Sequence, residues 1–90
     1  MTDRYGLRIA RPAAQALSQS LPEKIAHAAY EFINGPLLDN PRRVGKPLNP
    51  PLAPAYSARR GDYRILYLID DVARTVEVTA IRRRADAYRS

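Results

Sequence analysis

The stretch that decides the fold is ARRGDYRILYLID, residues 58–70. A Gly-Asp pair at residues 61–62 is typical of a tight turn, and the aromatic and branched apolar residues at 63–69 predict a strand. A shorter run at residues 56–59 precedes the turn, and residues 75–81, TVEVTAI, alternate between polar and apolar. Together they predict an antiparallel meander whose central strand is mostly covered on both faces.

One residue of the central strand is unusual for an apolar strand. Alternation places Tyr63 and Tyr67 on one face, where we expect them in the core, and Arg64 on the other face beside Leu66. A charge in a mostly apolar strand costs free energy unless it is paired or opens onto a cleft. Arg64 is therefore either half of an ion pair with Glu77 across the meander or a functional group on the sheet surface.

The first half of the chain predicts a strand followed by two helices. The strand is expected at residues 5–10, and a helix at about 13–19 follows Pro12, a residue suited to a first helical turn. Ser20 and Glu23 have the spacing of a capping box, which predicts the start of the second helix. This helix stops at an Asn-Gly-Pro sequence, and its apolar stripe consists of Ile25, Ala28, Ala29, Phe32 and Ile33.

A proline-rich segment, residues 36–54, connects the helices to the meander. It holds six prolines and also apolar residues such as Leu37 and Leu38, which can attach a long loop to a core. No shift in composition marks a second domain, so residues 1–90 are expected to form a single domain. The predicted class is α+β: an N-terminal strand, a helical hairpin, and a three-stranded antiparallel meander forming one sheet.

Charge is distributed unequally along the chain. Residues 1–40 hold four basic and four acidic side chains, whereas residues 41–90 hold eleven basic and five acidic ones. Of the 15 cations 13 are arginines, whose planar guanidinium group binds phosphate through two hydrogen bonds. The composition therefore indicates a polyanionic partner such as nucleic acid, with an ordinary solvated surface as the alternative.

The composition also excludes several kinds of site. The chain has no cysteine and one histidine, so disulfides, thiolate zinc sites and a cysteine nucleophile are excluded, and no metal site is expected. The histidine, His27, lies off the apolar stripe and is expected at the surface. No apolar stretch approaches the roughly 20 residues that cross a bilayer, and no secretion signal is apparent. We therefore expect a cytoplasmic protein without a membrane partner.

The order of these segments, together with two motifs, resembles the RelE/ParE superfamily of bacterial toxins, and the RelE branch in particular. The first motif is GDYR at residues 61–64, and the second is a basic residue followed four positions later by tyrosine, here Arg84 and Tyr88. The resemblance extends over nearly the whole chain and implies the RelE-like fold. It also implies a type II toxin–antitoxin toxin: a ribosome-dependent mRNA endoribonuclease that cleaves by 2′-hydroxyl attack without a metal or other cofactor.

The same resemblance implies partners and site residues. The partners are a cognate acidic antitoxin similar to RelB, the ribosome and mRNA, with DNA contacted only indirectly through the antitoxin. Arg64 matches the family's phosphate-binding arginine and is expected to stabilise transition-state charge, with Arg84 and Tyr88 as the other catalytic residues. The residues expected to bind RNA or the ribosome are Lys46, Arg59, Arg60, Arg82 and Arg83.

The sequence departs from the RelE branch at the proton-transfer residues. In that branch, lysines on the strand before the GDYR motif are implicated in proton transfer, but residues 55–59 contain none, and arginine is a poor proton acceptor. The base is therefore unassigned: Lys46, Asp62, Glu77 and Asp86 are candidates, or the ribosome supplies the group. The alternative functions are a ParE-like inhibitor of DNA gyrase and a catalytically inactive member that only binds an antitoxin.

Overall fold

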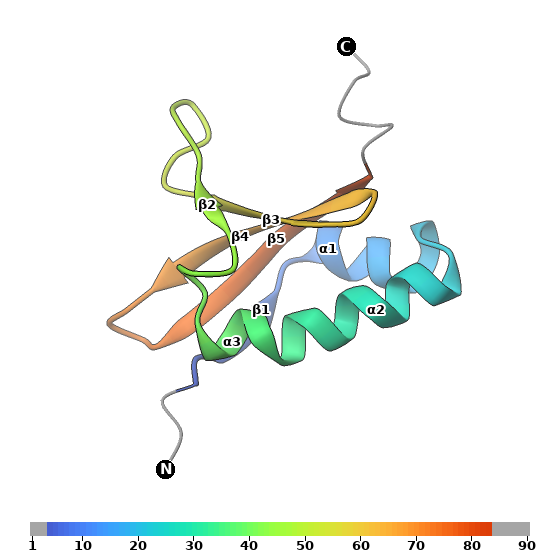
Figure 1. The fold of residues 1–90 in the computed structure, drawn as a ribbon, viewed down its shortest axis with the longest axis horizontal. Coiled ribbons are helices and arrows are strands. Elements are labelled where there is room, and N and C mark those ends of the chain that lie inside the picture. The colour runs from blue at the N-terminus through green and yellow to red at the C-terminus, as the bar shows by residue number, and fades with distance from the viewer. Residues whose placement is uncertain (1–3, 84–90) are drawn as a thin grey trace.

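The computed structural model describes residues 4–83, which form a five-stranded sheet with helices against one of its faces (Figure 1). The order of strands across the sheet is β1-β5-β4-β3-β2. Neighbouring strands are antiparallel except β1 and β5, which are parallel. The strands are β1 (Gly6–Ile9), β2 (Lys46–Pro47), β3 (Tyr56–Arg60), β4 (Tyr63–Asp70) and β5 (Thr75–Arg83).

The α+β class and the antiparallel meander are confirmed. The turn between β3 and β4 contains Gly61, whose φ of +60° is a left-handed conformation that glycine adopts without a steric penalty. The sequence does not predict two features: β2 extends the sheet beyond β3, and β1 pairs with β5 in the parallel sense. A strand of two residues is too short to show a period, and the direction of β1 depends on contacts distant in sequence.

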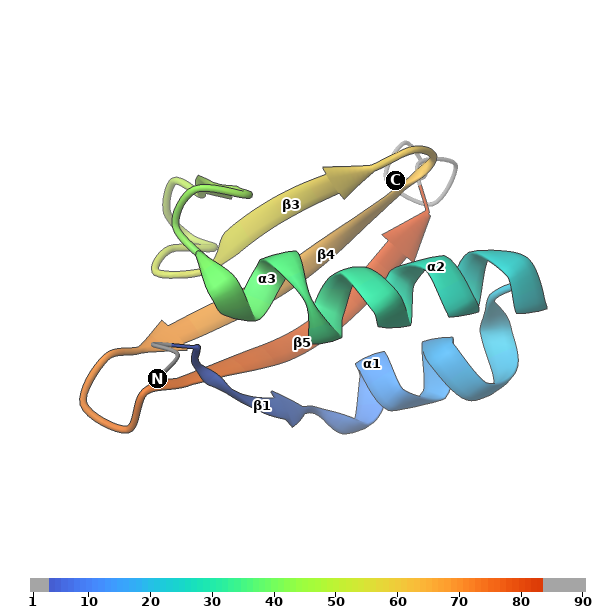
Figure 2. The same cartoon turned by 60° about the horizontal axis from the view of Figure 1, so that its bottom comes forward.

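The helices lie together on one face of the sheet (Figure 2). The first begins at Arg11 rather than near residue 13, because Pro12 fits the first turn, where its missing N–H breaks no hydrogen bond. Within residues 4–83 no helix has the length and apolarity to cross a bilayer. The helical elements are α1 (Arg11–Gln15), a π-helical turn η1 (Ala16–Ser20), α2 (Glu23–Asn34) and α3 (Pro36–Asp39).

The predicted capping box is wrong. Ser20 is the last residue of η1, where the backbone N–H of Leu21 donates to the carbonyl oxygen of Ala16 at 2.9 Å. Helix α2 begins at Glu23, is preceded by Pro22, and has no side-chain cap. Because the π-helical turn extends the first helical segment to Ser20, that residue is not available to cap the second helix.

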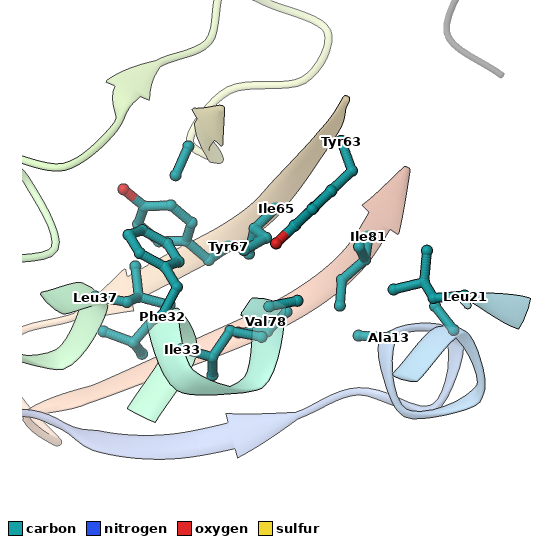
Figure 3. Close-up of a cluster of buried hydrophobic side chains, with 14 of the residues drawn as sticks. Ala13, Leu21, Phe32, Ile33, Leu37, Tyr63, Ile65, Tyr67, Val78 and Ile81 are labelled. Carbon is teal, nitrogen blue, oxygen red and sulfur yellow. The ribbon is translucent and has the colours of Figure 1, made fainter. Parts of the chain in front are cut away.

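The core lies between the helices and strands β4 and β5 (Figure 3). Ile33 of α2 and Leu37 of α3 are fully buried, as is Tyr67 of β4, and Tyr63 is nearly so, which confirms the two tyrosines as core residues. The apolar stripe of α2 is narrower than predicted, because Ala28 is exposed. His27 is at the surface, as expected, and its ring lies 3.2 Å from the Glu31 carboxylate.

The prediction that β4 is covered on both faces is wrong. Tyr63, Ile65 and Tyr67 are buried, whereas Arg64 is exposed and Leu66 is half-buried. All the helices lie on the face that carries the tyrosines, and on the other side the chain between β2 and β3 rises away from the sheet (Figure 1). We call the side of the sheet that carries Arg64 the open face.

A polar cluster joins three segments at the end of the sheet where β4 turns into β5. Arg42 donates two hydrogen bonds to the carboxylate of Asp71, at 3.0 and 2.6 Å. The hydroxyl of Tyr5 donates to the same carboxylate at 2.6 Å. The bonds from Arg42, and then that from Tyr5, lower the pKa of Asp71 to about 2. The cluster ties the loop after α3 and the residue before β1 to the β4–β5 turn.

This cluster predicts a loss of stability in acid. The pKa of Asp71 in the folded protein lies below its ordinary value of 3.8. The ionised carboxylate therefore contributes fully to the free energy of unfolding above about pH 4, and this contribution is lost as the pH falls towards 2. Urea unfolding at pH 5 and at pH 2.5 measures this loss. Asp71→Asn should be less stable at pH 5 and show a smaller difference between the two pH values. An unchanged pH dependence in that variant would contradict the prediction.

Candidate functional site

Three arginines from adjacent strands lie side by side on the open face. In the register of the sheet, Arg64 on β4 is opposite both Arg59 on β3 and Arg82 on β5. Residues opposite each other on antiparallel strands share a face, and all three are exposed. We call them the arginine row. Like charges in direct cross-strand positions destabilise a sheet, so a bound polyanion would relieve repulsion within the row.

A cavity of about 450 Å³ opens next to the arginine row. Four cations line it, two from the row and two from the segment before β3, and no carboxylate is among the described residues that line it. We call it the basic cavity. Its lining residues are Arg43, Val44, Gly45, Lys46, Leu48, Ser57, Arg59 and Arg64.

The segment that brings Arg43 and Lys46 to the cavity is fixed by a buried tyrosine. The hydroxyl of Tyr67 donates to the carbonyl oxygen of Pro41 at 2.6 Å, and burial raises the pKa of Tyr67 to about 12, which keeps this donor protonated. Gly45 lies against the same hydroxyl, so closely that a Cβ atom on Gly45 would overlap the hydroxyl oxygen. Residues 41–45 are therefore anchored from below by Tyr67.

The contact at Gly45 predicts that alanine is not tolerated there. Its methyl group would overlap the Tyr67 hydroxyl and lie 2.9 Å from a backbone carbonyl oxygen of β3. Gly45→Ala should therefore lower the free energy of unfolding by about 1–3 kcal/mol, measured by urea denaturation. Gly6→Ala is the matched control, because a Cβ there would be 3.7 Å from its nearest neighbour, an ordinary contact. Equal losses in the two variants would contradict the prediction.

The interpretation of Arg64 as half of an ion pair with Glu77 is wrong. Glu77 is opposite Leu68, four residues further along β4, and it neighbours Arg8 on β1. Arg64 lies instead between two other arginines. Within residues 4–83 the ion pairs are Arg4–Asp39, His27–Glu31 and Arg42–Asp71, and none includes the arginine row. Arg64 therefore presents an accessible positive charge.

The structure separates the residues predicted to bind RNA or the ribosome. Lys46, Arg59 and Arg82 lie on the open face, near or within the arginine row. Arg60 and Arg83 are both opposite Tyr63, on the face that the helices cover. The guanidinium carbon of Arg60 lies 4.6 Å from the centre of the Phe32 ring, a cation–π contact. Arg60 and Arg83 are therefore not part of the open-face site.

Two predicted catalytic residues, Arg84 and Tyr88, lie outside the described residues.

The sequence interpretation also missed a member of the site, Arg43. Arg43 follows Arg42 directly, yet Arg42 binds Asp71 whereas Arg43 lines the basic cavity. The sequence feature that could have pointed to Arg43 is the pair of adjacent arginines, Arg42 and Arg43, in the proline-rich segment expected to attach to the core. Their different roles depend on contacts that adjacent positions do not reveal.

The opposite end of the open face, near the β4–β5 turn, is largely acidic. A cavity of about 540 Å³ there is lined by Arg8 together with three carboxylates, Asp70, Asp71 and Glu77. The open face is therefore basic near the arginine row and largely acidic near the β4–β5 turn. A polyanion that binds this face is directed by charge towards the row.

The groups in the basic cavity suit charge stabilisation. Guanidinium groups bind phosphate oxygens through paired hydrogen bonds and keep their positive charge at any physiological pH. In the described part of the chain no group of three histidine, cysteine or carboxylate side chains is placed to hold a metal ion. The arrangement is chemically suited to a phosphate backbone, and one ammonium group, that of Lys46, lies among the guanidinium groups.

Comparisons with known proteins agree with this architecture. A family model for the ParE toxin of the type II toxin–antitoxin system parDE matches residues 5–88. Toxin RelE of Mycobacterium tuberculosis is 54% identical over 85 residues, covering 94% of this chain and 87% of that protein. Toxin RelG of the same organism is 47% identical over 85 residues, covering 94% of this chain and 97% of that protein.

A solved structure is similar as well. The toxin–antitoxin complex RelBE2 from Mycobacterium tuberculosis contains a chain that is 44% identical and superposes with a TM-score of 0.85. The match covers 90% of this chain and 99% of the other. Family model, sequence relatives and solved structure all concern the same group of proteins. The chain therefore belongs to the RelE/ParE superfamily, the toxins of type II toxin–antitoxin systems.

Proposed function

We propose that this toxin is a ribosome-dependent endoribonuclease that cleaves mRNA. The observation that carries the proposal is the exposed arginine row, with Arg64 at its centre and the basic cavity beside it. Three adjacent exposed guanidinium groups, none of them in an ion pair within residues 4–83, suit the sugar-phosphate backbone of a single RNA strand. The ribosome would supply the mRNA and hold it in an extended conformation.

The chemistry proposed is attack by the RNA's own 2′-hydroxyl on the adjacent phosphorus. The reaction needs a proton acceptor for that hydroxyl, positive charge near the non-bridging phosphate oxygens, and a proton for the departing 5′-oxygen. None of these needs a metal ion. In this proposal Arg64 stabilises the phosphate charge, and Arg59 and Arg82 orient the flanking backbone. Arg84 and Tyr88 remain proposed catalytic residues.

The test is a cleavage assay with purified toxin and ribosomes programmed with a defined mRNA. We expect cuts within the codon at the ribosomal A site, products that end in a 2′,3′-cyclic phosphate, and full activity in EDTA. Free mRNA without ribosomes should be cut far more slowly. Cleavage that stops when EDTA is added would contradict the mechanism, and an absence of cleavage on ribosomes would contradict the function.

A second candidate, inhibition of DNA gyrase, has one observation in its favour. Strand β3 carries no lysine beside the arginine row, although the RelE-type reaction needs a group that exchanges protons. A supercoiling assay run beside the ribosome assay separates the two functions. Binding to an antitoxin without activity in either assay would indicate a catalytically inactive member.

We also propose an acidic antitoxin as the protein partner. The chain has a formal net charge of +6, and the similar structure from Mycobacterium tuberculosis is a toxin–antitoxin complex. Complementary charge raises the association rate, and salt screens this effect. Association with the cognate antitoxin should therefore slow as the salt concentration rises, while dissociation changes less. DNA would be reached only through the antitoxin, and a ribosomal target implies a cytoplasmic location.

A further inference from the structure

We propose that Lys46 is the catalytic residue that accepts the proton of the attacking 2′-hydroxyl; this inference rests on the proposed ribonuclease function. Four cations line the basic cavity, and three of them, Arg43, Arg59 and Arg64, are guanidinium groups that keep their protons. An ammonium group loses and regains a proton far more readily. Among the charged residues described at this cavity, Lys46 is therefore the one that can exchange a proton.

The register of the sheet places Lys46 on the open face, the same face as Arg64. Lys46 of β2 is opposite Ser57 of β3, and Ser57 shares its face with Arg59, two residues further along the strand. Arg59 in turn is opposite Arg64. Lys46 is exposed and lines the same cavity as Arg64, so a strand bound in this cavity would lie against both side chains. Although β3 itself has no lysine, the adjacent strand provides one.

The anchor beneath this segment fixes the backbone next to Lys46. Lys46 follows Gly45, which lies against the Tyr67 hydroxyl, and that hydroxyl donates to the Pro41 carbonyl oxygen. Tyr67 is fully buried and stacks on Tyr56 with 5.7 Å between ring centres. The backbone that carries Lys46 is thus held on the core rather than on a free loop, as a proton acceptor requires.

The described carboxylates are less well placed. Asp62 lies in the β3–β4 turn and lines a hollow of about 10 Å³ with Arg59 and Arg64, which is room for one water molecule and not for a nucleotide. Glu77 is opposite Leu68, at the other end of the open face. Neither carboxylate lines the basic cavity.

The step balances without a further reactant. The neutral amine of Lys46 takes the 2′-hydroxyl proton as the 2′-oxygen forms a bond to phosphorus. The bond between phosphorus and the 5′-oxygen breaks, and this oxygen takes a proton from water. The products are a 2′,3′-cyclic phosphate and a 5′-hydroxyl, and the Lys46 ammonium then returns its proton to solvent. Arg64 faces the phosphate charge throughout.

The decisive variant is Lys46→Arg, which keeps the positive charge and removes the amine that can accept a proton. We expect kcat on programmed ribosomes to fall by about 100-fold or more, with KM nearly unchanged. Lys24→Arg on α2 is the matched control, because it makes the same change on an exposed helix remote from the cavity, and it should keep wild-type kcat. Circular dichroism checks that both variants fold.

A second measurement separates proton transfer from charge. Lys46→Ala should be slow and regain activity when a small primary amine is added, in proportion to the unprotonated amine present. Wild-type kcat in Lys46→Arg, or no recovery of Lys46→Ala with amine, overturns the assignment. If the wild type does not cut, the proposed function fails first.

Discussion

Arg64→Ala should lower the rate of ribosome-dependent cleavage by about 100- to 1,000-fold, as removal of a transition-state donor does in other enzymes. The reason is geometric. Arg64 is the centre of the arginine row, flanked on both sides and exposed, and it lines the basic cavity. The measurement is kcat with limiting toxin, at concentrations of programmed ribosomes that separate kcat from KM.

The control for Arg64 is an arginine at the same end of the sheet that points to the other face. Arg83 is opposite Tyr63, one residue out of phase with Arg82 and on the helix-covered side. Arg83→Ala removes the same charge and should change kcat by less than a few-fold. Similar losses in both variants would mean that total charge, and not the position of Arg64, governs the reaction.

Phe32→Ala should remove about 3–5 kcal/mol from the free energy of unfolding, the largest loss of stability expected from one substitution here. Phe32 is 4% exposed in the core between α2 and the sheet, and Arg60 covers its ring. Small domains have total stabilities of roughly 5–15 kcal/mol, so the variant should be close to unfolding at 37 °C. Urea denaturation gives the midpoint and the slope.

Tyr30→Ala is the control on the same helix. Tyr30 is 52% exposed on α2, two residues from Phe32, so its truncation leaves no cavity. A loss within about 0.5 kcal/mol is expected, as for other surface substitutions. If Tyr30→Ala were as damaging as Phe32→Ala, burial of the Phe32 ring would not account for the loss, and helix propensity could not account for it either, because alanine is the better helix former.

Much of the fold could be predicted because its strands have a clear period. The GDYR turn and the apolar run after it define β3 and β4, and alternation at residues 75–81 defines β5. The capping box at Ser20 failed because a π-helical turn, which depends on tertiary contacts, uses that residue. The missing cover over Arg64 could not be predicted, since the sequence does not say on which face of a sheet both helices will pack.

The candidate site was predicted only in part, and for a similar reason. The side chains of adjacent residues in a strand point to opposite faces of the sheet, so Arg59 lies on the open face while Arg60 lies over Phe32. A run of basic residues in the sequence shows that the region is positively charged. Which of these side chains share a face is known only when the register of the strands is known. Lys46 and Arg43 reach the cavity through β2 and the anchored loop before it, which leave no periodic signal.

The parallel pairing of β1 with β5 has a consequence for synthesis. Residues 6–9 hydrogen-bond with residues 75–78, so the first strand to be translated has no partner until the last strand emerges. Arg82 of the arginine row lies on that last strand. We therefore expect a growing polypeptide to lack both the partner of its first strand and the complete arginine row until β5 has emerged from the ribosome. Stalled chains that end before residue 75 should leave translation of a reporter message unaffected.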